Sequence, residues 1–534
     1  MRPTFMGFET AKRGIMVSQK GLDVVGHNIM NMQTPGYTRQ RVDVYAVATP
    51  TYASRYGSNK TWMAGQGVDS GGVSQIRDSF LDKRFREEYG DVGYYEVTAG
   101  ILQDIESAID EFGLNPDEEN AMGNGLQNGL HQIVDAIKSM AHLNADSTTH
   151  ATIVYTSFHN MTQLLRQFDA KLNNVAEQAK YDLGIATNEV NGILQQIHEL
   201  NENIAQDMAM TRSSNGEYYG PNELFDTRNL LLDQLAAYGN INVESHADGT
   251  VSVTMNGHPA VWTDQSYGKF LDQGFNLADP RGYEMLNLSR NSNGTVALNW
   301  QTDGERVDLL NGSLKGYLDM INGRGVNAHL TNEVTVEGVR FYKDKLNAFA
   351  STLADVVNNI LPQTTTDADG NVTPVAGRYL ELLSSSDGTP ITAANICTSA
   401  AWDQDNSMII YEKGNLDNDY LMKMQEALET GTFTFKGTGE VSDGLFTGTF
   451  YDFVQDYVTS QGAQTSFHLE RLSATNEISL NILDQRDSIS GVNQDEETVS
   501  MMAYQKMLQA CSRLMTTMDE ALDVLINRTG MVGR

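Results

Sequence analysis

The sequence predicts a mainly α-helical protein with one or more inserted β-rich domains. Three observations predict this fold: heptad-spaced apolar residues at both ends, helical spacing over about 40 middle residues, and frequent turn dipeptides between about 241 and 450. We expect the terminal helices to form a coiled coil (residues 1–45 and 493–534). A long helical bundle (46–240 and 451–492) and an outer β-rich insert (241–450) follow.

The N-terminal stripe has two columns of residues that repeat every seven positions. The first column contains Phe8, Ile15, Leu22 and Ile29, and the second contains Ala11, Ser18, Val25 and Met32. This is the a/d pattern of a coiled-coil helix. Four glycines interrupt it, each lowering helix stability by up to ~1 kcal/mol: Gly7, Gly14, Gly21 and Gly26. The pattern ends at Thr34-Pro35-Gly36, a strong helix terminator.

A second stripe occupies the C-terminal end. Its a positions are Tyr504, Cys511, Met518 and Leu525, its d positions are Met507, Leu514 and Ala521, and its e positions are Leu508, Met515 and Leu522. Asn493 is a good N-cap, and Glu496 three residues later resembles the second half of a capping box. The sequence therefore predicts a helix that begins just after Asn493.

Each apolar stripe must be buried against another surface. Two stripes of similar length bury most simply against each other. Because short isolated helices are marginal in water, we expect both ends to be weakly ordered in a free monomer and to become ordered when copies pack together. An ordinary intramolecular coiled coil is the alternative.

The middle of the chain contains predicted helices on both sides of a predicted β-rich insert. Apolar residues from Phe168 to Met208 recur every 3.6 residues on average, which predicts one long helix, and the segment from about 453 to 489 also reads as helical. In contrast, residues 251–255 alternate as a strand, with residues 241–245 as a hairpin partner across Asp248-Gly249. A helix near 339–361 interrupts the β-rich insert.

The charge distribution limits the possible partners. The net charge of −32 argues against nucleic-acid binding, and no apolar run reaches the length of a membrane span. No cleavable signal peptide is expected either, because Arg2, Glu9, Lys12 and Arg13 stand where a signal peptide would have its apolar core. Residues 1–86 hold 12 Lys or Arg against 6 Asp or Glu. This basic part is either a solvated surface or a contact for an acidic part of a neighbouring copy or partner.

Catalytic and metal-binding motifs are broken in this sequence. His198-Glu199 begins like a zinc helix, but Glu202 stands where a second histidine is needed. The calcium-like stretch 367–371 has its glycine at position four and Arg378 at position twelve. Two cysteines cannot form a four-ligand site. We therefore expect no enzymatic activity, no cofactor and no metal.

Three motifs resemble those of a known family. Residues 27–31 (HNIMN) with 34–40 (TPGYTRQ) resemble the N-terminal signature of flagellar rod, hook and hook-associated proteins, although His27 and Met30 depart from it. Residues 490–493 (SGVN) with 495–497 (DEE) resemble the C-terminal signature, with Gln494 as a departure. Residues 223–228 (ELFDTR) resemble an internal segment. Within the family, the chain is most similar to members at the hook–filament junction.

The resemblance implies a non-enzymatic structural subunit that joins hook to filament by helical self-assembly through its terminal helices. It implies export from the cytoplasm without signal cleavage and an extracellular location in the flagellum. The implied partners are further copies of the chain, the hook protein, the next hook-associated protein and an export chaperone at the C-terminal helix. Another axial protein of hook or distal rod remains an alternative, as does an adhesive or enzymatic activity of the insert.

We expect the assembly interface to lie on both terminal stripes and on the segment between Thr34 and Gln40. That segment is either a helix-stopping loop or a joint that contacts neighbours through Tyr37 and Arg39. The expected interface residues are Phe8, Ile15, Leu22, Val25, Ile29, Tyr37, Arg39, Tyr504, Met507, Leu508, Cys511, Leu514, Met515, Met518, Leu522 and Leu525.

Overall fold

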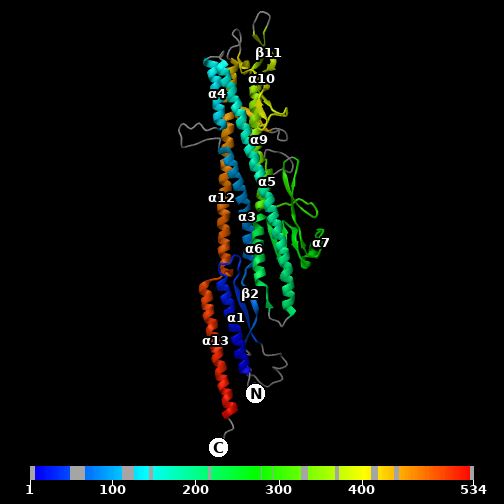
Figure 1. Cartoon of the computed structure of the whole chain (residues 1–534), viewed down its shortest axis with the longest axis vertical. Coiled ribbons are helices and arrows are strands. Elements are labelled where there is room, and N and C mark those ends of the chain that lie inside the picture. The colour runs from blue at the N-terminus through cyan, green and yellow to red at the C-terminus, as the bar shows by residue number, and fades with distance from the viewer. Residues whose placement is uncertain are drawn as a thin grey trace.

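The computed structural model describes residues 6–47, 67–110, 125–143, 148–213, 218–277, 279–292, 294–325, 335–366, 372–410, 419–437 and 444–528. This part of the chain is an elongated rod of long helices, with small sheets along one side (Figure 1). At one end of the rod, α1 (Met6–Met30) and α13 (Gln494–Asp523) lie side by side. A π-helical turn, Val524–Arg528, continues α13.

The body of the rod is built from α3 (Ser79–Asp110), α5 (Thr148–Ser213) and α12 (Phe450–Ser490), with α12 packed along α3. The predicted helix from Phe168 to Met208 is confirmed, and α5 extends beyond it at both ends. At a rise of ~1.5 Å per residue, α5 is about 100 Å long. The predicted late helix is confirmed as α12, which begins with a capping box between Thr449 and Asp452.

Two shorter helices complete the body. The first, α4 (Leu126–Leu143), packs against α5 at the end of the rod that is distant from α13 (Figure 1). The second, α6 (Asn222–Tyr238), packs against α3 and α5.

A four-stranded antiparallel sheet contains β4 (Ile241–Ser245), β5 (Val251–Met255), β6 (His258–Trp262) and β7 (Gly282–Tyr283). The predicted hairpin is confirmed, because Ile241 pairs with Met255 and Ser245 with Val251. Gly249 in its turn has φ +82°, a conformation that favours glycine. α7 (Asp264–Asp272) follows β6.

In the described ranges after β7, four two-stranded sheets follow. They pair β8 (Leu286–Arg290) with β9 (Val296–Trp300), β10 (Pro362–Thr366) with β11 (Val372–Tyr379), β12 (Leu383–Ser385) with β13 (Ile396–Thr398), and β14 (Phe433–Lys436) with β15 (Gly444–Gly448). Between them lie α10 (Ala400–Gln404), a 3-10 helix (Asn406–Ile409) and α11 (Asp419–Glu429).

Two helices of the expected outer insert contact the body. α8 (Ser313–Asn322) packs against α3 and α5, and α9 (Val339–Asn358) packs against α5. The helix predicted near 339–361 is thus confirmed as α9, with its end three residues earlier. Helices and strands alternate through 241–450, and part of this segment lies against the long helices. The three-domain division stays a prediction.

One continuous apolar core runs along the rod. Among the described residues it extends from Ile101 on α3 to Tyr457 on α12, and it contains no residue of α1 or α13. Its largest buried side chains include Phe158, Phe349 and Trp402. The terminal helices are therefore stabilised by contacts separate from the main core.

A small sheet lies beside the terminal helices. β1 (Gln40–Ala46) pairs antiparallel with β2 (Val68–Gln75), and β2 pairs parallel with β3 (Tyr218–Tyr219). α1 contacts both β1 and β2, and the Lys20 ammonium donates to the Ser70 hydroxyl at 2.9 Å. This sheet connects α1 to the body of the rod.

Candidate assembly interface

The helices α1 and α13 pack against each other as the two stripes predicted; together with the π-helical turn Val524–Arg528 that continues α13, they are called the terminal-helix pair. Glycines on α1 make the contact close. A methyl group built on Gly14 would lie 2.6 Å from Cys511 Sγ, and one built on Gly21 would lie 2.5 Å from Cε1 of Tyr504. At Gly7 the same group would overlap Met518. The glycines thus form a groove that receives successive a-position side chains of α13.

The two predicted columns of α1 differ in burial. Phe8, Ile15, Leu22 and Ile29 are partly buried and Ala11, Ser18 and Val25 are buried, whereas the glycines Gly14 and Gly21 are buried directly against Cys511 and Tyr504 of α13. The role of both columns in assembly stays a prediction. Glycine permits close backbone approach, so α1 also meets α13 at positions that carry no apolar side chain.

On α13, the residues of the predicted stripe fall into two groups. Seven are partly buried: Tyr504, Met507, Leu508, Cys511, Met515, Met518 and Leu522. In contrast, Leu514 is 45% exposed and Leu525 is 57% exposed. Among the described residues of α13, Glu497 alone is buried.

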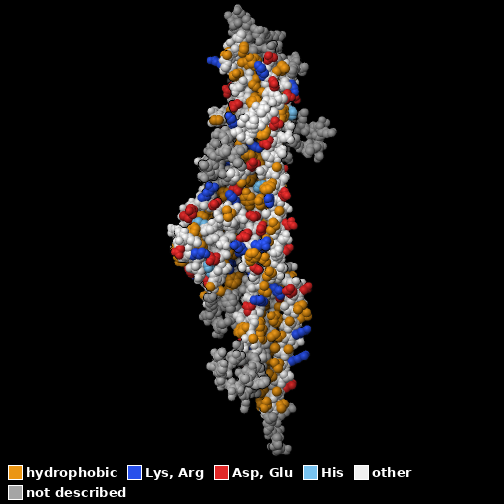
Figure 2. Space-filling model, turned by 180° about the vertical axis from the view of Figure 1, so that it is seen from behind, with side chains coloured by type: hydrophobic (Ala, Val, Ile, Leu, Met, Phe, Trp, Pro, Cys, Tyr) orange, Lys and Arg blue, Asp and Glu red, His pale blue; other side chains and the backbone are white. Residues whose placement is uncertain are grey.

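The terminal-helix pair leaves apolar side chains in solvent. Figure 2 shows hydrophobic side chains along the end of the rod that holds this pair. Besides Leu514 and Leu525, the exposed apolar residues of the pair are Met16, Met30, Val499, Met502, Val524 and Ile526. A surface of this kind is typical of a protein-interaction site.

The segment after α1 folds back on the helix through Asn28. The Asn28 side-chain carbonyl accepts the Tyr37 hydroxyl at 2.8 Å and the Gln40 backbone N–H at 3.0 Å. Its amide donates to the Gln40 carbonyl at 2.8 Å. Burial and the carboxylates of Asp226, Glu223 and Glu497 raise the pKa of Tyr37. Tyr37 is thus held inside its own chain, and residues 34–40, which connect α1 to β1, are called the joint below.

Arg39 connects this joint to α13. Its guanidinium donates to the Glu497 carboxylate at 2.7 Å and to the Glu496 carboxylate at 2.8 Å, and its backbone N–H donates to the Ser490 carbonyl. The predicted N-cap is confirmed, since Asn493 accepts from the backbone of Asp495 and Glu496. The contacts that the structure shows for Arg39 are intramolecular, and its contact with a neighbouring copy stays a prediction.

The internal segment 223–228 anchors the joint to the body. Asp226 on α6 accepts the Thr38 backbone N–H at 3.2 Å and the Gln75 amide at 2.8 Å. Burial raises the pKa of Asp226, and the hydrogen bond from Thr38 opposes that shift. Arg228 donates to the Gly249 carbonyl at 2.7 Å, while its burial and the nearby arginines lower its pKa to about 10.

A buried ion-pair network joins three helices of the body beside the joint. Asp233 on α6 accepts Arg86 of α3 at 2.7 Å and Arg486 of α12 at 2.6 Å. Arg77 pairs with Asp82 at the start of α3 and also donates to the Thr38 hydroxyl. Sequence reasoning missed this network, because no motif marks these residues and they are far apart in the chain.

Of the zinc-like and calcium-like motifs in the sequence, only the zinc-like one lies in the described part of the chain. His198 is on α5, with its ring 5.4 Å from that of Tyr283. The calcium-like stretch 367–371 lies outside the described residues. No helix in the described part of the chain has the length and apolar character needed to cross a membrane.

Comparison with family models gives two matches. Residues 119–374 match the helical domain of the flagellar hook-associated protein FlgK, and residues 484–528 match the C-terminal model of the flagellar basal body rod proteins FlgEFG. The second match contains the C-terminal signature and all of α13.

Comparison with curated proteins gives relatives of full length. Flagellar hook-associated protein 1 of Bacillus subtilis is 27% identical over 559 residues and covers 100% of both chains. Its counterpart from Salmonella typhimurium is 22% identical and covers 97% of this chain and 98% of the relative. A solved structure of the flagellar hook junction protein FlgK from Burkholderia pseudomallei aligns with a TM-score of 0.49 at 12% identity, covering 76% of this chain and 100% of that one. From the family models and the full-length relatives together, this chain is similar to flagellar hook-associated protein 1 along its whole length.

Proposed function

We propose that this chain is a structural subunit of the bacterial flagellum that forms the junction between hook and filament. Similarity to the flagellar hook-associated protein 1 of Bacillus subtilis over the full chain supports the role. The single structural observation that carries the mechanism is the apolar surface of the terminal-helix pair, which stands outside the main core. Burial of that surface against neighbouring copies drives assembly, at about 25 cal/mol per Å² of apolar area.

The copies assemble helically. A patch on the terminal-helix pair of one copy contacts a different patch on the next, and such a heterologous contact generates an open helix rather than a closed pair. The coiled-coil ends line the inside of the resulting tube, while the sheets beside α5 lie farther out. The basic residues among 1–86 support attraction to the acidic remainder of a neighbouring copy.

A position between hook and filament determines which proteins this chain would contact. The hook protein contacts one side of the assembled layer, and the next hook-associated protein contacts the other. Before assembly, an export chaperone covers the exposed apolar face of α13, and the chain leaves the cytoplasm without signal cleavage. The exposed side chains of Val499, Met502 and Leu514 support a chaperone site on this helix.

Substitution of Leu514 by Asp tests the assembly surface. Leu514 is exposed, so a carboxylate there leaves the α1–α13 contact intact and places a charge in the proposed interface between copies. Gln509→Asp adds the same charge at another exposed position of α13 and is the matched control. In a strain lacking its own junction protein, we expect filaments with the wild type and Gln509→Asp, and none with Leu514→Asp. Normal filaments with Leu514→Asp, at equal export, would contradict the proposal.

A hook or distal rod protein would share the terminal helices. The rod-protein model matches only residues 484–528, whereas the hook-associated relatives match nearly the whole chain. The junction is therefore favoured over another axial position.

A further inference from the structure

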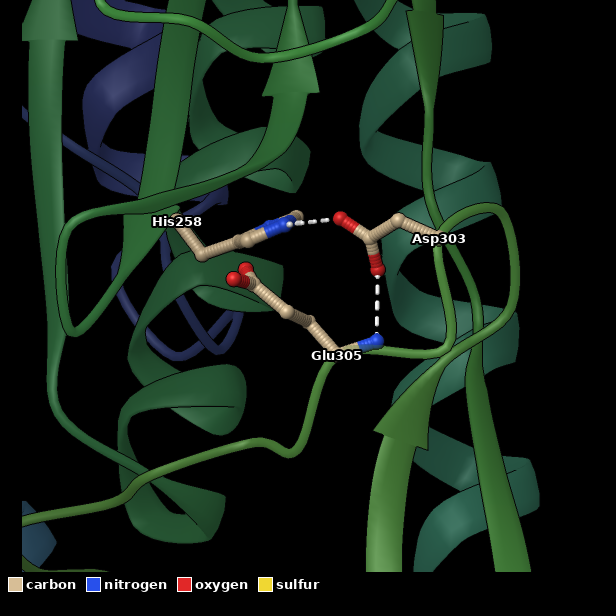
Figure 3. A group of neighbouring side chains, drawn as sticks. All are labelled: His258, Asp303 and Glu305. Atoms are coloured by element: carbon tan, nitrogen blue, oxygen red, sulfur yellow. Dashed lines mark hydrogen bonds and ion pairs between the residues drawn. The ribbon is translucent and has the colours of Figure 1, made fainter.

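Three potential metal ligands meet on the side of the rod that carries α7. His258 is the first residue of β6, and Asp303 and Glu305 lie in the loop after β9. Each offers one ligand atom, and these atoms lie within 4.8 Å of one another. Figure 3 shows the imidazole and the Asp303 carboxyl group facing each other, with the Glu305 carboxyl group beside them.

The imidazole of His258 is held in one orientation. Its ring stacks on Trp300 with centroids 4.3 Å apart and contacts the edge of Phe275 at 5.0 Å. Behind it lies Glu284, which is 4% exposed and whose Oε2 is 3.9 Å from His258 Nδ1. The other oxygen of Glu284 accepts the Thr302 backbone N–H at 2.9 Å, so this carboxylate is itself fixed.

Both ring nitrogens of His258 face oxygen atoms. Nδ1 is 3.2 Å from the Pro259 carbonyl, and Nε2 is 3.4 Å from Asp303 Oδ2. A neutral imidazole has one N–H, so when Nδ1 is protonated toward Pro259 and Glu284, the Nε2 lone pair points at a carboxylate oxygen. A cation bound between these two atoms attracts both the Nε2 lone pair and the carboxylate oxygen, so the repulsion is replaced by two favourable contacts.

The spacing fits coordination of one ion. Two ligand atoms, each ~2.1 Å from a tetrahedral zinc ion, are about 3.4 Å apart. The distance from His258 Nε2 to Asp303 Oδ2 matches this value. The buried carboxylate beside Nδ1 matches the usual surroundings of a metal-bound histidine, where such a group fixes the ring and increases its basicity.

We propose that His258, Asp303 and Glu305 bind a divalent transition-metal ion, with Zn²⁺ as the representative. One imidazole nitrogen with two carboxylate oxygens suits Zn²⁺, Co²⁺ or Ni²⁺, whereas Ca²⁺ and Mg²⁺ prefer six or more oxygen ligands. Asp303 and Glu305 are exposed, so water completes the coordination.

The ion has a structural role in this position. His258 belongs to the four-stranded sheet of β4–β7, whereas Asp303 and Glu305 follow the separate β8–β9 hairpin. The Asp303 carboxylate also accepts the Glu305 backbone N–H at 2.8 Å, which keeps both acidic residues on one side of the loop. Metal binding therefore cross-links the two sheets. Sequence analysis predicted no metal, because His258 and Asp303 are 45 positions apart and match no ligand motif.

The test is calorimetric titration of Zn²⁺ into the full chain after treatment with a chelator. We expect one saturable site with a dissociation constant on the order of 1 µM. Glu305→Gln and Asp303→Asn each remove a charged ligand and weaken binding at least ~10-fold, and Glu284→Gln weakens it by about 10-fold through the imidazole. His246→Ala is the matched control. His246 follows β4, and its Nε2 is hydrogen-bonded to Ser252 rather than to an acidic side chain. We expect His246→Ala to keep the wild-type affinity for Zn²⁺.

Thermal unfolding separates lost binding from lost folding. Because Glu305 is exposed, Glu305→Gln should melt like the wild type in chelator, and Zn²⁺ should raise the melting temperature of the wild type and His246→Ala but not of Glu305→Gln. The proposal is overturned by any of three results: no saturable Zn²⁺ binding below ~100 µM, wild-type affinity in Glu305→Gln, or equally tight binding of Ca²⁺.

Discussion

The Arg39 guanidinium and the Glu497 carboxylate form an ion pair of 2.7 Å between residues 458 positions apart. Arg39 lies between α1 and β1, and Glu497 lies in the first turn of α13 with 2% of its side chain exposed. The second oxygen of Glu497 accepts the Asn28 amide at 3.2 Å. One carboxylate therefore connects the end of α1, the joint and the start of α13.

Removing this carboxylate should loosen the terminal-helix pair. Glu497→Ala removes one acceptor from the partly buried Arg39 guanidinium and one from the buried Asn28 amide, which we expect to cost about 2–4 kcal/mol of the free energy of unfolding. Because the pair is outside the main core, the loss should appear as faster hydrogen exchange in α1 and α13, with α5 unchanged.

Glu496→Ala is the matched control for that experiment. Glu496 also pairs with Arg39, but its side chain is 61% exposed, so its removal should cost less than ~1 kcal/mol. Equal acceleration of exchange in the two variants would show that Glu497 has no special role.

The pairing of the two ends was predictable from the sequence, but its exact geometry was not. Heptad spacing predicted that the stripes bury against each other, and the N-cap at Asn493 predicted where α13 begins. The glycines were counted only as a cost to helix stability. Their second effect, the close approach of Tyr504 and Cys511, depends on the rotation of α1 about its axis, which an apolar pattern alone does not specify.

An alanine at Gly21 should weaken the contact that the glycines allow. Alanine favours a helix over glycine by up to ~1 kcal/mol, but here its methyl group would meet the Tyr504 ring at 2.5 Å and displace it. At Gly26, on the same helix, no heavy atom lies within 4 Å of that position. We therefore expect Gly26→Ala to slow hydrogen exchange in α1, and Gly21→Ala to accelerate it in α13. Slower exchange in both variants would contradict the close packing.

The sequence motifs mark the joint, but they do not mark the buried ion pairs beside it. Thr34-Pro35-Gly36 was predicted to end a helix, but the remainder of 34–40 and the segment 223–228 were identified by their resemblance to a family, and the structure places Thr38 and Asp226 in contact. Their neighbours Arg86, Asp233 and Arg486 have no such signal. These charges are buried only because three helices converge, and that convergence is a tertiary property that periodicity along one helix does not reveal.

Acid should weaken the contact between α3 and α12 through His468. Its Nδ1 lies 2.8 Å from the Thr98 hydroxyl, its ring contacts that of Tyr95, and burial lowers the pKa of His468 below the usual 6.5. The unfolded chain then binds the proton more readily, so stability falls as the pH drops below about 6.5. We expect the loss of melting temperature between pH 7.5 and 5.5 to be smaller in His468→Asn than in the wild type.

His246→Asn serves as the control for that titration, since it removes a histidine that contacts Ser252 and lies outside the contact between α3 and α12. It should keep the wild-type dependence on pH. If His468→Asn instead loses as much melting temperature as the wild type between the two pH values, the titrating group lies elsewhere.

A disulfide between α1 and α13 should form when Gly14 is replaced by cysteine. The Cβ built on Gly14 lies 3.7 Å from the Cβ of Cys511, within the range of ~3.5–4.5 Å found in disulfides. In a Cys397→Ser background, Gly14→Cys should therefore cross-link to Cys511 on mild oxidation of the dilute monomer. The cross-linked chain migrates faster on a non-reducing gel, and peptide mapping identifies the bond. Gly26→Cys, at an open position of the same helix, should stay reduced. Failure of Gly14→Cys to cross-link in the monomer, followed by efficient cross-linking in the assembled junction, would mean that the terminal helices pair only when copies pack together.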